Sequence, residues 1–477
     1  MTVLPELIIE QIKNIGIKSG ITPYLVGGYI RDKFLRRRTH DIDVMVETDA
    51  LEFARLFAKT YGYPSPIFYG RFGTAMIEIN KNKIEFATAR KESYDENSRK
   101  PHVKPATVLE DLARRDFTIN AIALNLLTGQ ILDPFGGKKD IRARIIRTPV
   151  DPDKTFYDDP LRILRGIRFA TTLNFNIEEN TKRAMANNAK RLLIVSQERI
   201  ADEIMKIIAA RKPSKGFFLM DEIGILELIL PEVALLKEKR TSHPCKELFE
   251  HTLQVLDNTA SLTKSPVFRL AALLHDIGKP KTLKVENGKV SFHRHEIIGA
   301  KMSIKVCEKL KVSQNDTETI GLLIRHHLRP HLLAKENPTD TALARFIREI
   351  GAHMKGLFII ARADITSKNE KKVNQGREKI LALYERIKQV NKKMRLAKFK
   401  LAIDGFDIME ILNIKPGKQV GLIKKNLEEL VLSGKIENKK KVLKEYLKKA
   451  GTDILAGVND EKRNNEYPVG TMENKFH

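Results

Sequence analysis

The stretch of residues 25–44 reads LVGGYIRDKFLRRRTHDIDV, and its pattern decides the fold of the amino-terminal part. Residues 24–26 form an apolar run that ends in a pair of glycines, residues 29–36 have helical periodicity, and residues 41–47 form a second apolar run. Glycines that follow a strand permit a tight turn into a helix. We therefore expect a strand, a helix and a strand in succession, the beginning of an α/β head.

Two acidic residues, Asp41 and Asp43, flank Ile42 on the second expected strand. Side chains two residues apart share one face of a strand and stand about 6.5–7 Å apart. Carboxylates so placed can bridge a pair of Mg²⁺ ions that activate an attacking hydroxyl and stabilise a leaving pyrophosphate. Gly28 and Arg31, at the start of the expected helix, would present donors to a triphosphate. The alternative for Arg31 is an ordinary surface residue.

The composition predicts a polyanionic partner. The chain has 477 residues, with 85 Lys and Arg against 60 Asp and Glu, and a formal net charge of +25. Lysine and arginine neutralise phosphates, so nucleic acid is favoured over a membrane surface; the alternative is a protein that is simply rich in lysine. Cys245 and Cys307 are too few for a disulfide framework, and no signal peptide or membrane-spanning run is evident. We therefore expect a cytoplasmic protein without a membrane partner.

Further motifs follow along the chain: LEDLARRDFTINAIAL (109–124), DPFGGKKDI (133–141), DDPLRILRGIRFA (158–170) and QERIADEI (197–204). Together with the first stretch, their order and spacing resemble the class II tRNA nucleotidyltransferase and bacterial poly(A) polymerase family. The resemblance implies an α/β nucleotidyltransferase head, a small mixed sheet with helices, at residues 1–147. It also implies an all-α neck at residues 148–247 that selects the nucleotide and binds RNA.

The resemblance also implies roles for individual residues of these motifs. Arg115, in RRDF, would contact the triphosphate together with Gly28 and Arg31. Asp116 and Asn120 of the same motif are expected to fix the local turn. The DPFGG segment resembles the hinge between head and neck of the family, so we expect a flexible turn there.

A stripe of polar residues begins at Asp159 and continues with Arg162, Arg165 and Arg168, three residues apart as on one helix face. Asp159 can accept a hydrogen bond from an exocyclic amine and Arg162 can donate to a ring nitrogen, an edge that cytosine and adenine share. Guanine and uracil present a carbonyl instead, and an unpaired buried polar group is costly. The stripe resembles the family's template for CTP and ATP, with Arg165 and Arg168 on phosphates; the alternative is a solvated basic face. Asp158 departs from the family, which has the longer Glu there.

Glu85, on the expected strand IEFATA, is a candidate for a third metal-binding carboxylate. The alternative is a glutamate on the solvent face of an edge strand. Residues 74–79 and 84–89 are expected to form a hairpin. The segment YGRFGTAMIEI (69–79) lacks the second Arg and the following His-Val that the poly(A) polymerases of the family usually carry, which favours CCA addition.

Residues 248–367 carry a second set of motifs: FEHTLQVL, LLHDIGK, HRHEIIGAKM, IRHHLRP and ARADITS. His275 and Asp276 follow the apolar run LAALL and would lie at the wall of a helical bundle, where His251 and Asp364 complete a set of four ligands. This order of residues is similar to that of the HD-superfamily metal phosphohydrolases. Imidazole and carboxylate ligands suit a divalent Mn, Ni, Co, Fe or Zn ion, or Mg.

Other histidines lie close to these motifs. His295 and His326 stand where binuclear members of the HD superfamily carry additional ligands, so both are candidate ligands of a second ion. Their neighbours His293 and His327 are expected to be bystanders or substrate contacts, and His331 has no expected role. A hydrogen-bonded core histidine is the alternative to a ligand.

Residues 368–477 are expected to form a basic helical region that ends in a frayed tail. Positive charge concentrates at residues 386–400 and 435–449, either as a solvated face or as a surface for the backbone of a folded RNA. The segment LNIKPGKQVGLI (412–423) resembles a short element near the end of family members that contain an HD domain.

From the resemblance we expect a template-independent CCA-adding tRNA nucleotidyltransferase. With Mg²⁺ at Asp41 and Asp43, it would transfer CMP and AMP from CTP and ATP to the tRNA 3′ end. A poly(A) polymerase and an enzyme that adds only A or only CC remain as alternatives. A metal-dependent phosphohydrolase with an RNA-binding head is a further one, and the sequence leaves open whether the HD domain hydrolyses a phosphate ester.

Overall fold

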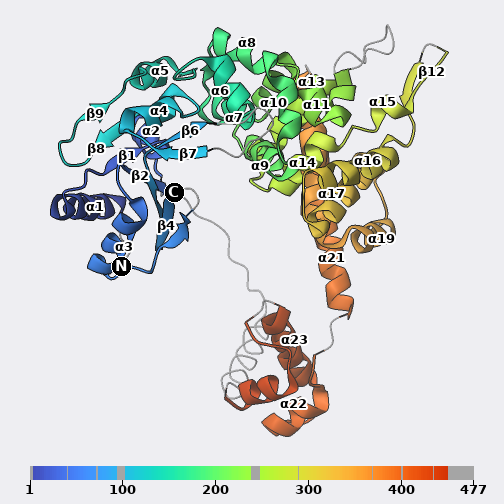
Figure 1. Ribbon diagram of the computed structural model, residues 1–477. Helices are drawn as coiled ribbons and strands as arrows, with labels where there is room; N and C mark the ends of the chain where they lie inside the picture. Colours follow the sequence, from blue (N-terminus) through green and yellow to red (C-terminus); the bar gives the residue numbers. More distant parts are fainter. Residues whose placement is uncertain are drawn as a thin grey trace, which may run out of the picture. The chain divides into compact units, whose positions relative to one another are not determined.

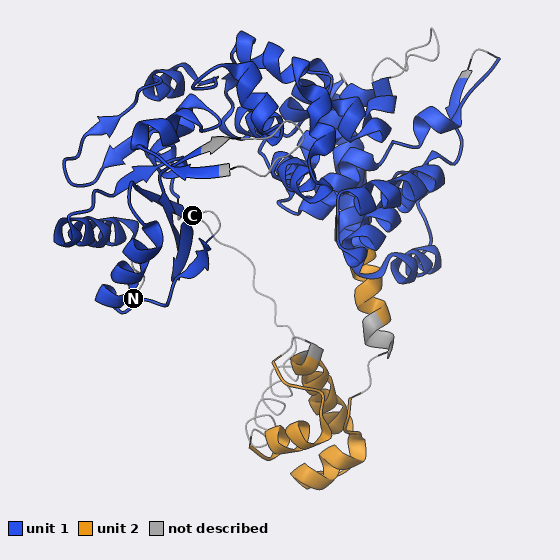
Figure 2. Ribbon diagram, in the orientation of Figure 1, with its two compact units in different colours: residues 1–386 blue, residues 387–477 orange. Residues whose placement is uncertain are grey.

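The computed structural model describes residues 4–39, 41–70, 73–93, 102–237, 248–287, 289–367, 369–398, 401–432 and 435–449. These residues belong to two compact units, 1–386 and 387–477, which Figure 2 shows in different colours. A mixed sheet lies in the blue to cyan part of the first unit, and helices follow in its green to orange part (Figure 1). The expected α/β head followed by helical regions is therefore confirmed. Among the described residues, we find no helix that combines the length and the hydropathy of a membrane-spanning segment.

The head is built on a seven-stranded sheet in which β2 and β5 are parallel and the other neighbouring strands are antiparallel. Because β5 lies between β4 and β2, Glu85 is not on an edge strand. The expected hairpin forms from β4 and β5, with Ile79 opposite Asn82. The strand order is β3 (Ile67–Tyr69), β4 (Thr74–Ile79), β5 (Asn82–Thr88), β2 (Asp41–Val46), β1 (Tyr24–Val26), β8 (Ala123–Asn125) and β9 (Ile131–Leu132).

Helix α3 (Ala50–Tyr61) covers one face of this sheet and leaves the carboxylates on the other. Its start is capped by the Asp49 carboxylate, which accepts a hydrogen bond from the Leu51 N–H at 2.8 Å. Phe53 and Phe57 pack against Phe86 of β5, with ring centroids 5.9 and 5.5 Å apart. Because side chains alternate along a strand, Glu85 projects from the opposite face of β5.

The remaining head elements surround the sheet. The DPFGG segment is a closely packed helix start: the Asp133 carboxylate accepts from the Gly137 N–H at 2.6 Å, and a Cβ on Gly137 would lie 2.2 Å from the Thr118 carbonyl oxygen. The expected turn is present at residues 134–135, and its flexibility stays a prediction. The elements are α1 (Pro5–Ser19), α2 (Gly28–Phe34), β6 (Arg90–Ser93), β7 (His102–Pro105), α4 (Val108–Ala113), the 3₁₀ turn η2 (Thr118–Asn120) and α5 (Gly137–Ala143).

Helix α7 joins the neck to the head. Gly166 on α7 lies so close to Phe117 of the head that an added Cβ would be 2.8 Å from the ring. The short strands β10 (Ile145–Ile146) and β11 (Asn176–Ile177) pair beside it. The neck helices are α6 (Pro152–Asp158), α7 (Leu161–Leu173), α8 (Glu179–Asn187), η3 (Ala189–Ile194), α9 (Gln197–Ile208), α10 (Ser214–Glu222), α11 (Leu226–Ile229), α12 (Pro231–Ala234) and η4 (Leu235–Lys237).

The histidine-rich region is a helical bundle that is attached to the neck by a buried arginine. Arg269 donates to the carbonyl oxygens of Ile208 and Ala210, both at 2.9 Å, at the end of α9. The sequence did not predict the hairpin of β12 (Leu283–Glu286) and β13 (Lys289–Phe292). The helices are α13 (Leu248–Leu262), α14 (Pro266–Leu274), α15 (Lys279–Thr282), α16 (His295–Lys309), α17 (Gln314–His326), α18 (Arg329–Glu336), α19 (Asp340–Ile350), η6 (Gly351–His353) and α20 (Met354–Asp364).

The second unit is small and helical. It begins within α21 (Glu370–Lys398) and contains α22 (Gly405–Leu412), α23 (Lys418–Leu432) and helical residues 440–449 around an aliphatic core. Lys440 and Lys444, in one of the predicted basic segments, pair with Asp407 at 3.2 and 2.8 Å, so part of this charge serves the fold. The expected frayed tail lies outside the described residues.

Candidate active site and candidate metal centre

Carboxylates from two adjacent strands meet at the centre of the head sheet. Asp41 and Asp43 lie on β2, and the parallel register places Asp43 directly opposite Glu85 on β5. Gly27 lets the turn before α2 approach them, because its φ is +67° and a Cβ there would lie 2.9 Å from the Asp43 carboxylate. The structure thus groups the two predicted carboxylates with the third candidate, Glu85.

The surroundings of Asp43 disfavour an uncompensated negative charge. Burial raises the pKa of Asp43 to about 6; Arg115 opposes the rise, and the carboxylates of Glu85 and Asp41 add to it. A divalent cation would relieve this repulsion, and carboxylate oxygens are ligands that Mg²⁺ prefers. The donor set therefore fits Mg²⁺.

Two arginines beside the carboxylates are held in place by acceptors of the head. Arg31 donates to the side-chain oxygen of Asn120 at 2.9 Å and pairs with Asp32 at 2.9 Å. Arg115 pairs with the buried Asp111 at 3.0 Å. A guanidinium has five N–H donors, so both arginines retain donors for an anion.

The polar stripe begins before α7 rather than on it. Asp159 has an extended backbone (φ −135°, ψ 95°) between α6 and α7, because a residue that precedes a proline, here Pro160, avoids the helical region. Arg162 projects from the first turn of α7 and donates to the Arg114 carbonyl oxygen at 2.8 Å. Burial raises the pKa of Asp158, the residue that departs from the family, and Arg162 opposes this rise.

The buried carboxylate of Asp116 connects the head to the neck. It pairs with Arg165 of α7 at 2.7 Å, and it accepts hydrogen bonds from the Asn120 amide at 2.9 Å and from the Phe117 N–H at 2.8 Å. Burial opposes its ionisation, but Arg165 and Asn120 lower the pKa of Asp116 to about 2. The two residues expected to fix a turn therefore also hold the arginine stripe.

Phe169 lies among three arginines of the site. The guanidinium carbons of Arg168, Arg31 and Arg165 lie 4.2, 5.1 and 5.5 Å from its ring centroid. Arg168 also pairs with the buried Glu203 of α9 at 2.7 Å. Cations over an aromatic face are attracted by its quadrupole, so Phe169 helps to keep these charges together.

A single cleft of about 620 Å³ contains both halves of this site. Its walls come from the head sheet, from α2 and from α7 and α9 of the neck. The structure therefore brings together every residue predicted for the nucleotidyltransferase site. These lining residues are Gly28, Arg31, Asp41, Asp43, Glu85, Arg115, Asp159, Arg162, Arg165 and Arg168.

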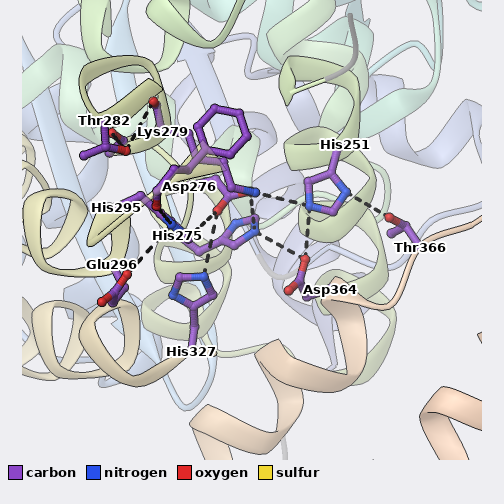
Figure 3. A network of polar contacts seen from close by, with 12 residues as sticks. His251, His275, Asp276, Lys279, Thr282, His295, Glu296, His327, Asp364 and Thr366 are labelled. Atoms are coloured by element: carbon purple, nitrogen blue, oxygen red, sulfur yellow. Dashed lines mark hydrogen bonds and ion pairs between the residues drawn. The ribbon is translucent and has the colours of Figure 1, made fainter. Parts of the chain in front are cut away.

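The second predicted site is a cluster in the helical bundle, where side chains from separate helices point toward one another (Figure 3). The Asp276 carboxylate faces both sides of it: one oxygen lies 3.3 Å from His275 Nε2, and the other lies 3.4 Å from His295 Nε2. His251 Nε2 is 3.0 Å from Asp364. Among the described residues, two groups could each hold a metal ion, because the ligand atoms within each group lie within 4.8 Å of one another. The first group is His251, His275 and Asp364, and the second is Asp276, His295 and His327.

The histidine rings are oriented as in metal centres. The Nδ1 atoms of His275, His295 and His327 lie 2.7–2.8 Å from the carbonyl oxygen three residues earlier in the chain. This contact favours a proton on Nδ1 and leaves Nε2 as a ligand atom toward the centre. Among the described residues, Nε2 of His275 and His295 and one oxygen of Asp276 are buried without a hydrogen bond. The cluster therefore fits a divalent metal, and Asp276 could contact two ions.

The electrostatics of the cluster favour positive charge at its centre. Burial opposes protonation of His275, but Asp276 and Asp364 raise its pKa to about 10. Burial and the neighbouring His275 lower the pKa of His327 to about 4. Burial opposes ionisation of Asp276, but His275 and Lys279 lower its pKa. The carboxylates thus stay ionised, as metal ligands must.

The structure corrects the choice between two adjacent histidines. His327 is 1% exposed and lies 3.8 Å from Asp276, whereas His326 turns toward Glu349, also at 3.8 Å. Adjacent residues at a helix end point in different directions, so only one of them faces the bundle. His327 therefore replaces His326 in the candidate second group. His331, which had no expected role, lies 3.4 Å from Asp364.

Sequence reasoning also missed residues that hold other residues of the two sites in place. Asp111 and Glu203 bind arginines of the head site, Phe169 packs against three of them, and Lys279 pairs with Asp276 at 2.5 Å. The signals were present in the motifs, because buried arginines need acidic partners and Lys279 follows Asp276 by three residues. Which acid serves which arginine depends on the tertiary fold.

Three family models match successive parts of the chain. A model described as the Poly A polymerase head domain matches residues 23–147. The model "Probable RNA and SrmB-binding site of polymerase A" matches residues 174–236, and the HD domain model matches residues 248–369.

Curated relatives cover most of the chain. The chain is 30% identical over 437 residues to the CCA-adding enzyme of Lactobacillus helveticus, and this alignment covers 90% of the chain and 93% of the relative. It is 29% identical over 428 residues to the A-adding tRNA nucleotidyltransferase of Deinococcus radiodurans, at 86% and 92% coverage. The fold is similar to the crystal structure of the Bacillus stearothermophilus CCA-adding enzyme with CTP, with TM-score 0.56, 21% identity, and 97% and 100% coverage.

The Asp116 clamp predicts a pH-dependent contribution to stability. A pKa lowered from 3.8 to about 2 corresponds to about 2 kcal/mol, present above pH 4 and lost as the pH falls toward 2. We expect Asp116→Asn to lower the free energy of unfolding by about that amount, equally at pH 7 and pH 5, and by less at pH 3. Urea denaturation measures it.

Asp202→Asn is the control, because Asp202 forms an exposed pair with Lys206. It should cost less than about 0.5 kcal/mol. Equal costs for the two variants at pH 7, or a cost of Asp116→Asn that grows on acidification, would contradict the clamp.

The metal cluster predicts different effects of two adjacent substitutions. We expect His327→Gln to weaken Mn²⁺ binding by at least about tenfold, because a ligand is lost, and His326→Gln to leave binding unchanged. Elemental analysis after equilibrium dialysis measures the bound metal, with circular dichroism to verify folding. Loss of metal in His326→Gln alone would show that the wrong histidine was assigned.

Proposed function

Because the chain belongs to the tRNA nucleotidyltransferase and poly(A) polymerase family, we propose that it is a CCA-adding enzyme. It transfers CMP and AMP from CTP and ATP to the 3′ end of tRNA without a nucleic-acid template. One observation supports this proposal most strongly: the acidic group, which is Asp41, Asp43 and Glu85, lines the same cleft as the pair Asp159 and Arg162. Chemistry and base selection can therefore act on one bound nucleotide.

The acidic group is the part of the site at which the nucleotidyl transfer takes place. Asp41, Asp43 and Glu85 would hold Mg²⁺, which would supply Lewis-acid activation of the attacking hydroxyl and neutralise charge on the leaving pyrophosphate. In the transfer, the RNA 3′ oxygen bonds to the α-phosphorus and loses its proton, and the bond from that phosphorus to pyrophosphate breaks. Arg31 and Arg115, fixed by Asn120 and Asp111, bind the triphosphate.

Base selection depends on a protein edge of fixed geometry. Asp159 accepts from the amine of cytosine or adenine, and Arg162 donates to the adjacent ring nitrogen. The hydrogen bond from Arg162 to the Arg114 carbonyl oxygen orients its guanidinium before the nucleotide arrives. Arg165 and Arg168 hold phosphates and share their guanidinium groups with Asp116 and Glu203.

The number of nucleotides added distinguishes complete CCA addition from A addition and from poly(A) synthesis. Relatives named as CCA-adding and as A-adding match the chain at 30% and 29% identity, so overall similarity does not separate the two reactions. The segment 69–79 favours CCA addition over poly(A) synthesis, because it lacks the residues that the family's poly(A) polymerases carry. We therefore propose complete CCA addition.

The cluster around Asp276 supports a second activity, metal-dependent hydrolysis of a phosphate ester. The observation that favours it is the set of buried Nε2 and carboxylate atoms without hydrogen bonds. A divalent metal at His251, His275, Asp276 and Asp364 would supply an activated water. Hydrolysis of 2′,3′-cyclic nucleotides that His275→Gln abolishes would support this activity, and hydrolysis that survives the substitution would contradict it.

The length of the product distinguishes the proposed reaction from its alternatives. With CTP and ATP, we expect a tRNA that lacks its CCA end to gain three nucleotides and then stop. A long A-tail would indicate a poly(A) polymerase, and extension only of a tRNA that already ends in CC would indicate an A-adding enzyme. Gel electrophoresis with labelled nucleotides resolves these products.

Asp43→Asn should abolish the addition, because it removes a metal-binding carboxylate. Glu78→Gln is the matched control: Glu78 is an exposed carboxylate on β4, opposite Lys83. Full activity of Asp43→Asn would exclude the metal mechanism.

A further inference from the structure

The sheet face that bears the carboxylates continues past them as an open surface. The strand registers place Asp43, Glu85, Met76 and Ile67 in one row across β2, β5, β4 and β3. Met76 lies on the strand next to Glu85, about 4.8 Å away, and Ile67 lies on the strand after that. The row is therefore apolar from the first strand beyond Glu85. Ile67 is 54% exposed there.

A pocket of about 300 Å³ lies over this surface, lined by Tyr69, Met76, Lys83 and Arg90 among others. It shares Lys83, Arg90 and Glu85 with the main cleft, so the two are continuous. Tyr69 is 48% exposed. The next residue toward the amino end, Phe68, has the Arg55 guanidinium 4.6 Å from its ring centroid and does not line the pocket. Aromatic and apolar groups thus face the pocket next to positive charges.

The chemistry of the proposed transfer determines what must occupy this side. In phosphoryl and nucleotidyl transfer, the attacking and leaving oxygens lie roughly in line on opposite sides of the phosphorus. In the proposed reaction, the triphosphate binds at Gly28, Arg31 and Arg115, next to β1 and α2, and the leaving pyrophosphate is therefore on this side of the α-phosphorus. The attacking hydroxyl must therefore approach from the side of β5, β4 and β3, where the pocket lies.

We propose that this pocket holds the 3′-terminal nucleotide of the RNA that is extended. Tyr69 stacks on its base over Met76, and Lys83 and Arg90 offset the charge of the adjoining phosphodiester. Aromatic stacking has no sequence preference, since every base presents a π-face, so the pocket accepts each successive 3′ end. The inference rests on the proposed nucleotidyl transfer and adds the subsite for its acceptor.

The test combines a substitution with a modified acceptor. Stacking on an aromatic side chain is worth a large factor in affinity, so we expect Tyr69→Ala to raise the KM for tRNA about tenfold. The KM for CTP should change less than about twofold, and Tyr69→Phe should restore the value. Phe68→Ala, on the same strand but outside the pocket, is the control.

An acceptor RNA whose terminal nucleotide is abasic keeps the 3′ hydroxyl and lacks the stacked base. We expect it to impair the wild-type enzyme about as much as Tyr69→Ala does, and to add little to the effect of that substitution. Fully multiplicative effects, or equal KM values for Tyr69→Ala and Phe68→Ala, would overturn the acceptor subsite. Failure of the wild-type enzyme to extend any RNA would instead overturn the proposed function.

Discussion

The ion pair between Asp116 and Arg165 is the constraint on which the nucleotidyltransferase site depends. A buried carboxylate is stable only with charge-assisted partners, and Asp116 has a guanidinium from the neck and an amide and a backbone N–H from the head. This pair joins α7 to the segment of the head that lies between α4 and η2. Asp159 and Arg162 then face the same cleft as Asp41 and Asp43, so one ligand can contact both groups.

Both sites use the same physical device: a reactive side chain is oriented by a neighbour before any ligand arrives. In the head, Asn120 and Asp111 hold the arginines that face the cleft. In the bundle, carbonyl oxygens one turn earlier hold the histidine rings with Nε2 toward the centre. Such preorganisation means that a ligand or ion needs little rearrangement to bind.

Much of the fold and of the head site could be predicted, because the informative patterns are local. The spacing of Asp41 and Asp43 on a strand and the glycines before α2 specify their own geometry. The partner of Glu85 could not be predicted, because strand order is decided by packing between distant segments. The choice of His326 over His327 failed for a similar reason, since the direction of α17 into the bundle determines which of the two rings is buried. Asp159 lies before α7 rather than on it, a difference that Pro160 could have indicated.

The proposed reaction requires that Asp159, in the link before α7, and Arg162, on the first turn of α7, select the base of a nucleotide held at the carboxylates. Single-turnover addition by Asp159→Ala, with each of the four nucleoside triphosphates, tests it most directly. We expect the variant to transfer nucleotides but to lose most of its preference for CTP and ATP over UTP and GTP, because the amine acceptor is gone. Unchanged discrimination would contradict the account, because selection would then reside elsewhere in the protein.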